Sequence, residues 1–360
     1  RVPGAMGRAN VRPAGVPDGA RRPAPGAMAR VAFRRPIRLS YSTVPCSRPR
    51  QTDAPMAPAF DPAFEASRPN RAKPPWLRKP LVVSDGPVAR TLRQGRLHTV
   101  CEEARCPNRR ECWQGERTAT FMILGDRCTR NCRFCSVPAG RPAQPDPTEP
   151  ERVAEAVAAL GLRYVVITMV ARDDLPDGGA AAMAETVRAI RHKTSDCRVE
   201  VLPSDFGGER TAIETLVAAR PVVFGLNLET VRRLTPFARS GSTYERSLSA
   251  LRVVRELAPE LPTKSALMVG LGESHDEVCA AMDDLRAAGT ELLAIGQYLQ
   301  PTRAQLPVQR YWTPAEFAAL RAEALRRGFA ACEAGPWVRS SYKADAMYAT
   351  AMARRGCGAE

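Results

Sequence analysis

The chain has 360 residues, of which 44% are hydrophobic and 25% charged, and its formal net charge is +15. This composition is typical of a globular protein with one large domain or two ordinary ones. No run approaches the roughly 18 apolar residues that a membrane span needs, so we expect a soluble protein without membrane contact. The first 80 residues hold 16 basic and 4 acidic residues, which leaves the remainder a net charge of only +3. That remainder lacks the basic footprint of a nucleic-acid binder.

The basic N-terminal leader is also rich in proline, with 15 of the 32 prolines in the first 80 residues. Such a composition buries too little apolar surface to offset chain entropy, and we expect residues 1–70 to be disordered. The leader lacks the apolar core of a secretory signal. We favour upstream sequence included by an early start, with Met28 and Met56 as later starts, and a cytoplasmic protein. The alternative is a transit peptide, which would imply a mitochondrial or plastid location.

Six of the eleven cysteines lie between Cys101 and Cys135. The odd total, the tight grouping and the absence of a secretory signal argue against a disulfide framework, so we expect metal ligands. The first three have the spacing Cys101-x4-Cys106-x5-Cys112 and lie in an extension over residues 71–117. The other five are expected to be ordinary thiols: Cys46, Cys197, Cys279, Cys332 and Cys357.

From residue 118 onward, short β-branched runs alternate with amphipathic segments. The runs predict six strands within residues 118–125, 164–170, 198–205, 222–229, 263–272 and 292–300. The amphipathic segments predict six helices within residues 148–161, 178–193, 208–220, 242–258, 274–289 and 313–328. Six consecutive strand–helix units indicate a parallel α/β sheet, either doubly wound or an incomplete barrel, over residues 118–330. Residues 331–360 form a separate C-terminal segment in this prediction.

The ends of the predicted helices carry recognisable signals. Several helices open on Ser or Thr with an acidic residue two or three positions later, a pattern that favours capping. Gly161, Gly289 and Gly328 close three of them.

The second group of cysteines is Cys128-x3-Cys132-x2-Cys135, in the loop between the first predicted strand and its helix. Function in parallel α/β folds lies at the carboxyl ends of strands, where this loop begins. Structural zinc prefers four ligands in pairs, and the chain has only three histidines, His98, His192 and His275. Three thiolates can instead hold three irons of a four-iron cluster and leave the fourth open for chemistry. A zinc knuckle is the alternative.

A Cys-x3-Cys-x2-Cys loop after the first strand of a repeated β/α fold resembles the radical S-adenosylmethionine (SAM) superfamily. Over roughly residues 97–348, stretches such as "CEEARCPN", "RDDLPDGGA", "GQYLQPT" and "RSSYKAD" resemble the lipoyl synthases. The resemblance implies a partial (β/α)6 barrel of the TIM type, with an N-terminal cluster-binding extension and a C-terminal segment that folds back over it.

The same resemblance implies two 4Fe-4S clusters and S-adenosylmethionine as cofactors. The cluster on Cys128, Cys132 and Cys135 would cleave S-adenosylmethionine to a 5′-deoxyadenosyl radical. An auxiliary cluster on Cys101, Cys106 and Cys112 would donate sulfur to carbons 6 and 8 of a protein-bound octanoyl-lysine. In this family a serine of "RSSY" completes the auxiliary ligands, and we favour Ser341 over Ser340. The implied partners are an octanoylated lipoyl-carrier domain and a ferredoxin- or flavodoxin-like electron donor.

Further residues are possible contacts of the cofactor. The stretch Gly270 to Glu273 resembles a glycine-rich motif near the adenine, although a strand-to-helix turn also favours glycine for structural reasons. Arg172, Asp173 and Asp174 follow the second predicted strand and either bind the cofactor or cap the next helix. Lys264 and Arg310 are noted without an assigned role.

Three stretches at strand ends depart from the pattern of the family: Met169 and Ala171, Gly225 and Leu226, and Pro203-Ser204. Because of these departures, the sequence does not define the shape of the cofactor or substrate pocket. A divergent paralogue that acts on a related acyl substrate is therefore an alternative. An iron–sulfur electron carrier without a substrate and a zinc-dependent nucleic-acid binder are the rival readings from other classes.

Overall fold

The computed structural model describes residues 72–78, 86–104, 106–109, 111–115 and 118–356. The leader predicted to be disordered, residues 1–70, lies outside the described residues. Among the helices of the described part, none combines the length and apolar character that crossing a bilayer requires.

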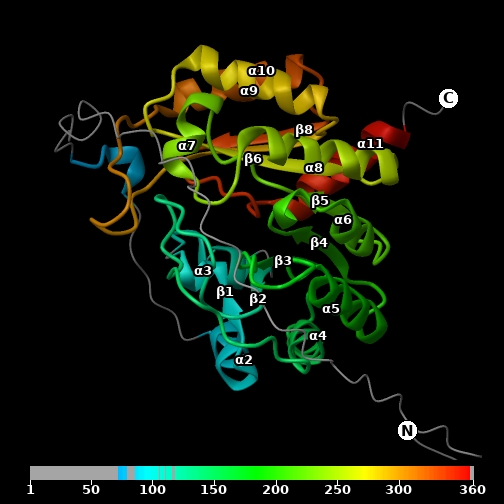
Figure 1. Ribbon diagram of the computed structural model, residues 1–360. Coiled ribbons are helices and arrows are strands. Elements are labelled where there is room, and N and C mark those ends of the chain that lie inside the picture. The colour runs from blue at the N-terminus through cyan, green and yellow to red at the C-terminus, as the bar shows by residue number, and fades with distance from the viewer. Residues whose placement is uncertain (1–71, 79–85, 105, 110, 116–117, 357–360) are drawn as a thin grey trace, which may run out of the picture. The chain divides into compact units, whose positions relative to one another are not determined.

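The core of the fold is one eight-stranded sheet in which the strands follow each other in chain order (Figure 1). The first pairing, between β1 and β2, is antiparallel, and all later pairings are parallel. No pairing joins the last strand to the first within the described residues, so the sheet stays open. The strands are β1 (His98–Thr99), β2 (Ala119–Ile123), β3 (Tyr164–Met169), β4 (Arg198–Leu202), β5 (Val223–Gly225), β6 (Thr263–Val269), β7 (Leu292–Gln297) and β8 (Ala331–Gly335).

The six predicted strands are confirmed as β2 to β7, and the open parallel sheet agrees with a partial barrel. The structure adds a seventh parallel strand, β8, inside the segment that we had set apart as C-terminal. Its sequence, "ACEAG", contains no β-branched or aromatic residue and so gives no strand signal. Pairing with β7 over Leu292 to Gly296 makes it a strand, which is a tertiary effect.

All six predicted helices are present, and in Figure 1 they follow one another along the sheet in the order of the strands. The α-helices are α2 (Pro87–Gly95), α3 (Val100–Glu103), α4 (Glu149–Ala159), α5 (Ala180–Lys193), α6 (Arg210–Val217), α7 (Thr235–Ala238), α8 (Tyr244–Leu257), α9 (His275–Ala287), α10 (Pro314–Arg326) and α11 (Ala344–Gly356). Short helical turns are η1 (Pro75–Leu77), η2 (Glu111–Gly115), η3 (Phe206–Gly208) and η4 (Arg232–Leu234).

The predicted helix-start signals are confirmed most clearly at α9 and α10. Ser274 and Glu277 form a reciprocal capping box at α9, and Thr313 and Glu316 form another at α10. Each box satisfies backbone N–H groups that a helix start otherwise leaves unpaired. The predicted closing glycines follow α4, α9 and α10 with positive φ.

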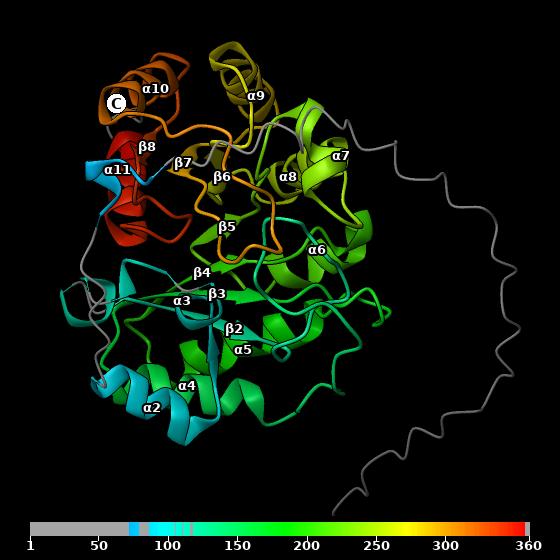
Figure 2. The same cartoon turned by 90° about the vertical axis from the view of Figure 1, so that its left-hand side faces the viewer.

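The two faces of the sheet are buried by different partners because successive strand residues point to opposite sides. Val165 and Ile167 belong to the large core shared with the outer helices. On the other face, α11 contacts β3, β7 and β8, and Met347 packs against Val223 and Leu292. Figure 2 shows α11 beside β8. The last helix therefore covers part of the face that is turned away from the outer helices, which we call the inner face.

The inner face also holds a buried polar group of three side chains. The Lys264 ammonium donates to Glu200 at 2.9 Å, and both side chains are 2% exposed. The Tyr164 hydroxyl donates to the second oxygen of Glu200 at 2.6 Å. Lys264, which had no assigned role in the sequence, is therefore the counter-charge of a buried carboxylate.

The segment between β8 and α11 reaches the inner face at a glycine. A Cβ atom added to Gly296 of β7 would lie 2.1 Å from the Val338 carbonyl oxygen and 3.3 Å from the Arg339 guanidinium. Real Cβ atoms do not approach backbone oxygen so closely, and any side chain here would push the segment away. Gly296 is thus the position that lets residues 337–342 dock on the sheet.

We predict that Gly296→Ala destabilises the fold by about 1–3 kcal/mol, through steric conflict with the Val338 backbone. Urea unfolding measures the loss, and limited proteolysis reports release of residues 337–342. The matched control is Gly335→Ala on the paired position of β8, where the new Cβ would meet only a Val338 methyl at 3.4 Å. Equal stability and equal protease resistance of the two variants would contradict this account of the docking.

Candidate active site

The second group of cysteines faces a cavity of about 190 Å³ at the carboxyl ends of β3, β4 and β5. Cys128, Cys132 and Cys135 all line it, as predicted from the position of their loop. The other lining residues come from this loop, from the three strand ends and from the end of α7: Arg130, Phe134, Val137, Thr168, Met169, Ala171, Leu202, Pro203, Ser204, Asp205, Leu226, Asn227, Glu229 and Arg239.

Backbone hydrogen bonds fasten the cysteine loop to its surroundings. Cys128 N–H donates to the Pro138 carbonyl at 2.9 Å, and Gly140 N–H donates back to the Cys128 carbonyl at 2.9 Å. At the other end, the Gln305 side chain donates to the Cys135 carbonyl at 3.1 Å. The three thiols are therefore carried by backbone that is fixed on both sides.

A buried arginine inside the loop connects it to two strand ends. Arg130 is 8% exposed and lies between Cys128 and Cys132. Its guanidinium pairs with Asp173, which follows β3, at 2.7 Å, and with Asp205, which follows β4, at 2.7 Å. Arg246 also pairs with Asp205, at 2.9 Å. A buried charge without a partner is costly, so these pairs leave the loop one favourable position.

The pKa of the Asp205 carboxyl and the pKa values of two of the thiols shift in opposite directions. Burial alone would raise the pKa of Asp205, but hydrogen bonds and charge from Arg130 outweigh it and lower that pKa to about 2. Burial raises the pKa of Cys132, and it raises that of Cys135 to about 11. These two thiols are therefore protonated at neutral pH until a metal displaces the proton.

Besides Arg130, Thr168 and Asp205, three more polar lining residues were not singled out in the sequence: Asn227, Glu229 and Arg239. Burial raises the pKa of the Glu229 carboxyl, against the opposing charge of Arg239. Glu229 has a positive φ of 71°, held by hydrogen bonds of its backbone to Ala266 and Met268 of β6. Such strained backbone collects at functional sites. Asn227 and Glu229 lay inside the range predicted as a strand, residues 222–229, whereas β5 ends at Gly225; their place at the carboxyl end of that range was the available signal.

Arg172, Asp173 and Asp174 do not cap the next helix, and their contact with the cofactor stays a prediction. Arg172 forms a bidentate ion pair with Asp174, in which both N–O distances are 2.9 Å. Asp173 forms an ion pair with Arg130 instead. None of the three lines the cavity. Asp177 instead accepts hydrogen bonds from the first turn of α5.

The glycine-rich stretch after β6 follows the structural explanation. A Cβ on Gly270, whose φ is 112°, would lie 2.1 Å from the Gln297 side chain and 2.6 Å from the Arg310 carbonyl. The Glu273 carboxylate accepts from the N–H groups of Gly270 and Leu271 and from the indole of Trp312. Arg310 itself pairs with Glu316 and stacks over Trp312.

The first group of cysteines lies on short elements next to β2. Cys101 is in α3 and buried, Cys112 is in η2, and Cys106 donates its backbone N–H to the Cys101 carbonyl at 3.1 Å. Burial raises the pKa of Cys101 to about 11, and the nearby Cys106 adds to this shift. The two thiols are therefore neighbours in space.

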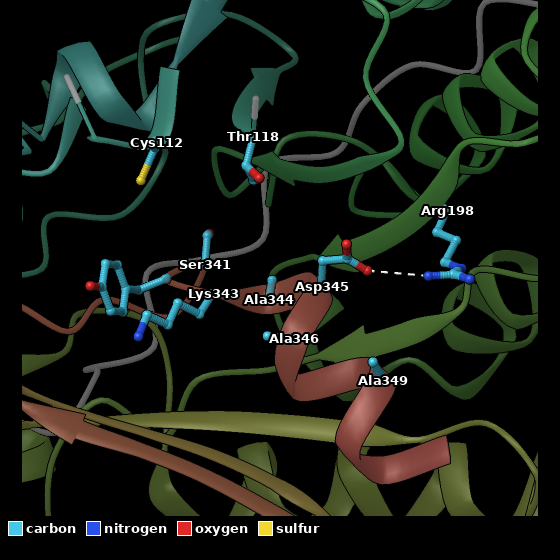
Figure 3. A pocket seen from close by; sticks show the side chains of 10 residues that line it. Cys112, Thr118, Arg198, Ser341, Lys343, Ala344, Asp345, Ala346 and Ala349 are labelled. Atoms are coloured by element: carbon cyan, nitrogen blue, oxygen red, sulfur yellow. Dashed lines mark hydrogen bonds and ion pairs between the residues drawn. The ribbon is translucent and has the colours of Figure 1, made fainter. Parts of the chain in front are cut away.

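The "RSSY" segment lies against this first group of cysteines. The Asn108 amide donates to the Trp337 carbonyl at 2.5 Å, and the Tyr342 hydroxyl donates to Glu111 at 2.8 Å. Ser341 and Cys112 line one cavity of about 220 Å³ and face it from opposite sides in Figure 3. Ser340 is not among its lining residues. The predicted fold-back of the C-terminal segment is thus present.

The donor sets fit iron–sulfur clusters in their chemistry. Each set offers three thiols, of which the whole second group lines one cavity and Cys112 of the first group lines the other. Soft thiolates are the ligands that such clusters use. The indole N–H of Trp113 lies beside the Cys101 sulfur, yet it is buried and completes no hydrogen bond of normal geometry in the described part of the chain. A cluster sulfide would satisfy this donor. No three His, Cys, Asp or Glu side chains converge on a point where one metal ion could sit, among the residues that the structure describes.

Most of the departures from the family pattern lie at the cavity of the second group. Met169, Ala171, Pro203, Ser204 and Leu226 all line it. Gly225 does not, and a Cβ there would lie 3.1 Å from the Val201 carbonyl oxygen. The positions that depart from the family pattern therefore form part of the cavity wall, and none of them is a cysteine of the two groups.

We predict that Asp205→Asn lowers the free energy of unfolding by about 2 kcal/mol at pH 7, because Arg130 and Arg246 lose a buried counter-charge. The folded pKa lies below the unfolded value of about 3.9, so this stabilisation is fully present above that pH and is lost as the pH falls toward 2. Urea unfolding of both proteins at decreasing pH measures the difference. A constant difference across the acid range would contradict the assignment.

Comparison with known proteins identifies relatives over most of the chain. Residues 122–285 match the model of the radical SAM superfamily. A lipoyl synthase of Shouchella clausii is 56% identical over 275 residues, which cover 76% of this chain and 89% of the relative. A lipoyl synthase of Geobacillus thermodenitrificans is 57% identical over 275 residues, 76% of this chain and 92% of the relative. The crystal structure of methylornithine synthase (PylB) aligns with a TM-score of 0.46 at 12% identity, over 68% of this chain and 71% of that chain.

The aligned relatives share more than half of their residues with this chain over about nine tenths of their own length. The loop of the second group of cysteines at the strand ends, the first group of cysteines beside it and the C-terminal segment that closes over the first group are what the family resemblance predicted from the sequence. The chain belongs to the lipoyl synthase family, within the radical SAM superfamily.

Proposed function

We propose that the protein inserts two sulfur atoms, at carbons 6 and 8, into an octanoyl chain carried on a lysine of a lipoyl-carrier domain. Membership of the lipoyl synthase family supports this reaction. The observation that supports it in this chain is the cavity shared by Cys112 and Ser341, because a hard oxygen donor and one thiol of the first group line the same space. An electron carrier with two ordinary clusters would have no use for such a donor.

In this proposal Cys128, Cys132 and Cys135 hold the cluster that binds S-adenosylmethionine. The cavity that they face offers one cationic and one anionic side chain, Arg239 and Glu229. These suit the carboxylate and the ammonium of an amino-acid moiety, and Asn227 adds an amide between strand end and cavity. When bound, the cluster supplies the electron that cleaves S-adenosylmethionine, and the auxiliary cluster supplies the sulfur.

The auxiliary cluster would be held by Cys101, Cys106 and Cys112, with Ser341 as the fourth ligand. Ser341 is preferred to Ser340 because it shares the cavity with Cys112. An oxygen ligand is harder than thiolate and binds iron less tightly in a sulfur-rich centre. Such a ligand suits a cluster that gives up sulfur.

The proposed substrate requires radical chemistry rather than acid–base catalysis. The hydrogens of an octanoyl chain are not acidic, so no side chain of the site could remove them as protons. Phe134, Met169 and Leu226 give part of the cavity wall an apolar surface. The protein contributes the position of the reactants, and the cofactors contribute reactivity.

The proposed partners are an octanoylated carrier domain and a small reductant of the ferredoxin or flavodoxin type. A cytoplasmic location stays a prediction. The departures at Met169, Ala171 and Leu226 favour one second candidate, a related acyl substrate, because all three line the cofactor cavity.

We predict that anaerobically reconstituted protein, with dithionite and S-adenosylmethionine, adds two sulfur atoms to an octanoyl-lysine peptide and forms 5′-deoxyadenosine. Mass spectrometry of the peptide and chromatography of the nucleoside measure the two products. An unchanged peptide mass together with no 5′-deoxyadenosine would refute the proposed reaction. Sulfur insertion into a peptide with another acyl length, and not into octanoyl-lysine, would select the second candidate.

Ser341→Ala and Ser340→Ala form a matched pair in the same assay. Ser341→Ala is expected to abolish sulfur insertion while 5′-deoxyadenosine is still formed, because the radical site is intact. Ser340→Ala is expected to retain sulfur insertion. The reverse pattern would move the ligand to Ser340.

A further inference from the structure

One hydrogen bond joins the immediate neighbours of two proposed ligands of the auxiliary cluster. Tyr342, which follows Ser341, donates its hydroxyl to Glu111, which precedes Cys112, at 2.8 Å. We propose that this hydrogen bond is a latch, and that Tyr342 is a positioning residue which holds the Ser341 oxygen at the auxiliary cluster. This inference rests on the proposed function, since it presumes a cluster on the first group of cysteines.

The latch acts between two anchored ends of a segment, because Ala344 at the start of α11 is also buried, against Tyr164 and Val166. At its start, Trp337 accepts a hydrogen bond from Asn108 and donates one from its indole to the Trp76 carbonyl, at 3.1 Å. Val338 is buried on the inner face of the sheet. These contacts fix residues 337–338, three or more positions before Ser341. Tyr342, directly beside the serine, supplies a side-chain hydrogen bond to Glu111, next to Cys112 of the first group of cysteines.

The ring of Tyr342 is held by packing that does not involve its hydroxyl. It packs against the cluster of Ala266, Ala294 and Val338 on the inner face. The Lys343 ammonium lies 5.5 Å from the ring centroid. Replacement by Phe would keep this packing and remove only the hydroxyl that reaches Glu111.

The strength of the latch suits a ligand that has to leave. Glu111 is exposed, so water competes for its carboxylate and the hydrogen bond opens readily. In the proposed reaction the auxiliary cluster is dismantled, and Ser341 must then part from its iron. A buried ion pair in this place would resist that step, whereas an exposed phenol–carboxylate bond holds the serine and still permits release.

The test uses the full chain with Cys128→Ala, Cys132→Ala and Cys135→Ala, so that only the first group of cysteines can carry a cluster. Iron is loaded anaerobically, and the loss of visible absorption on adding EDTA gives a rate. Tyr342→Phe is expected to lose its iron about threefold to tenfold faster, the range that one hydrogen bond supplies. The electron paramagnetic resonance spectrum of its reduced cluster should shift toward that of Ser341→Ala.

Coupling between the two residues separates a latch from a general loss of stability. If Tyr342 acts through the serine, Tyr342→Phe adds no further acceleration once Ser341→Ala is present. The matched control is Tyr348→Phe on α11, whose ring packs against Tyr164 and lies outside the cavity. This control should lose iron at the rate of the parent chain.

Two results would overturn the latch while leaving the proposed function intact: a parent-like rate for Tyr342→Phe, or accelerations by Tyr342→Phe and Ser341→Ala that multiply. Acceleration by Tyr348→Phe as large as that by Tyr342→Phe would also overturn it. A parent chain that binds no iron on the first group of cysteines would overturn the proposed function and the latch together.

Discussion

The pairing of Arg130 with Asp173 and Asp205 is the interaction on which the site depends. The loop of the second group of cysteines has no regular secondary structure, so contacts with other elements decide where it lies. One guanidinium inside the loop is held by carboxylates that follow β3 and β4. Because Arg130 and Asp205 are buried, no alternative position of the loop pairs these two charges equally well. The thiols and the strand ends are therefore positioned together, and the cavity between them is a consequence.

The two groups of cysteines are also tied to each other. The Ser136 hydroxyl, next to Cys135, donates to the Glu103 carbonyl in α3 at 2.6 Å, and α3 carries Cys101. A reaction in which one site generates a substrate radical and the other supplies sulfur requires a fixed spacing between them. The C-terminal segment is tied to the same site. Gly296 leaves room for its backbone on the inner face of the sheet, and Tyr342 donates a hydrogen bond to Glu111, next to Cys112.

Much of the scaffold follows from local sequence patterns. Six buried β-branched runs and six amphipathic segments predicted β2 to β7 and their helices, and the loop position of Cys128 placed the second group of cysteines at the strand ends. Local patterns failed where tertiary contacts decide: "ACEAG" becomes β8 only by pairing with β7. Arg130 finds its partners more than forty positions away in the sequence, at Asp173 and beyond. Of the two explanations offered for Gly270, the close approach of Gln297 and Arg310 supports the structural one, and it too depends on tertiary contacts.

The central claim is that two separate groups of thiols each hold an iron–sulfur cluster. Iron and sulfide analysis of anaerobically reconstituted protein tests it most directly, with the whole chain compared with two triple variants. The account predicts about eight irons per chain, and about four when either Cys101, Cys106 and Cys112 or Cys128, Cys132 and Cys135 are replaced by alanine. An iron content near four in the unaltered chain, or one that is insensitive to loss of either group, would contradict it.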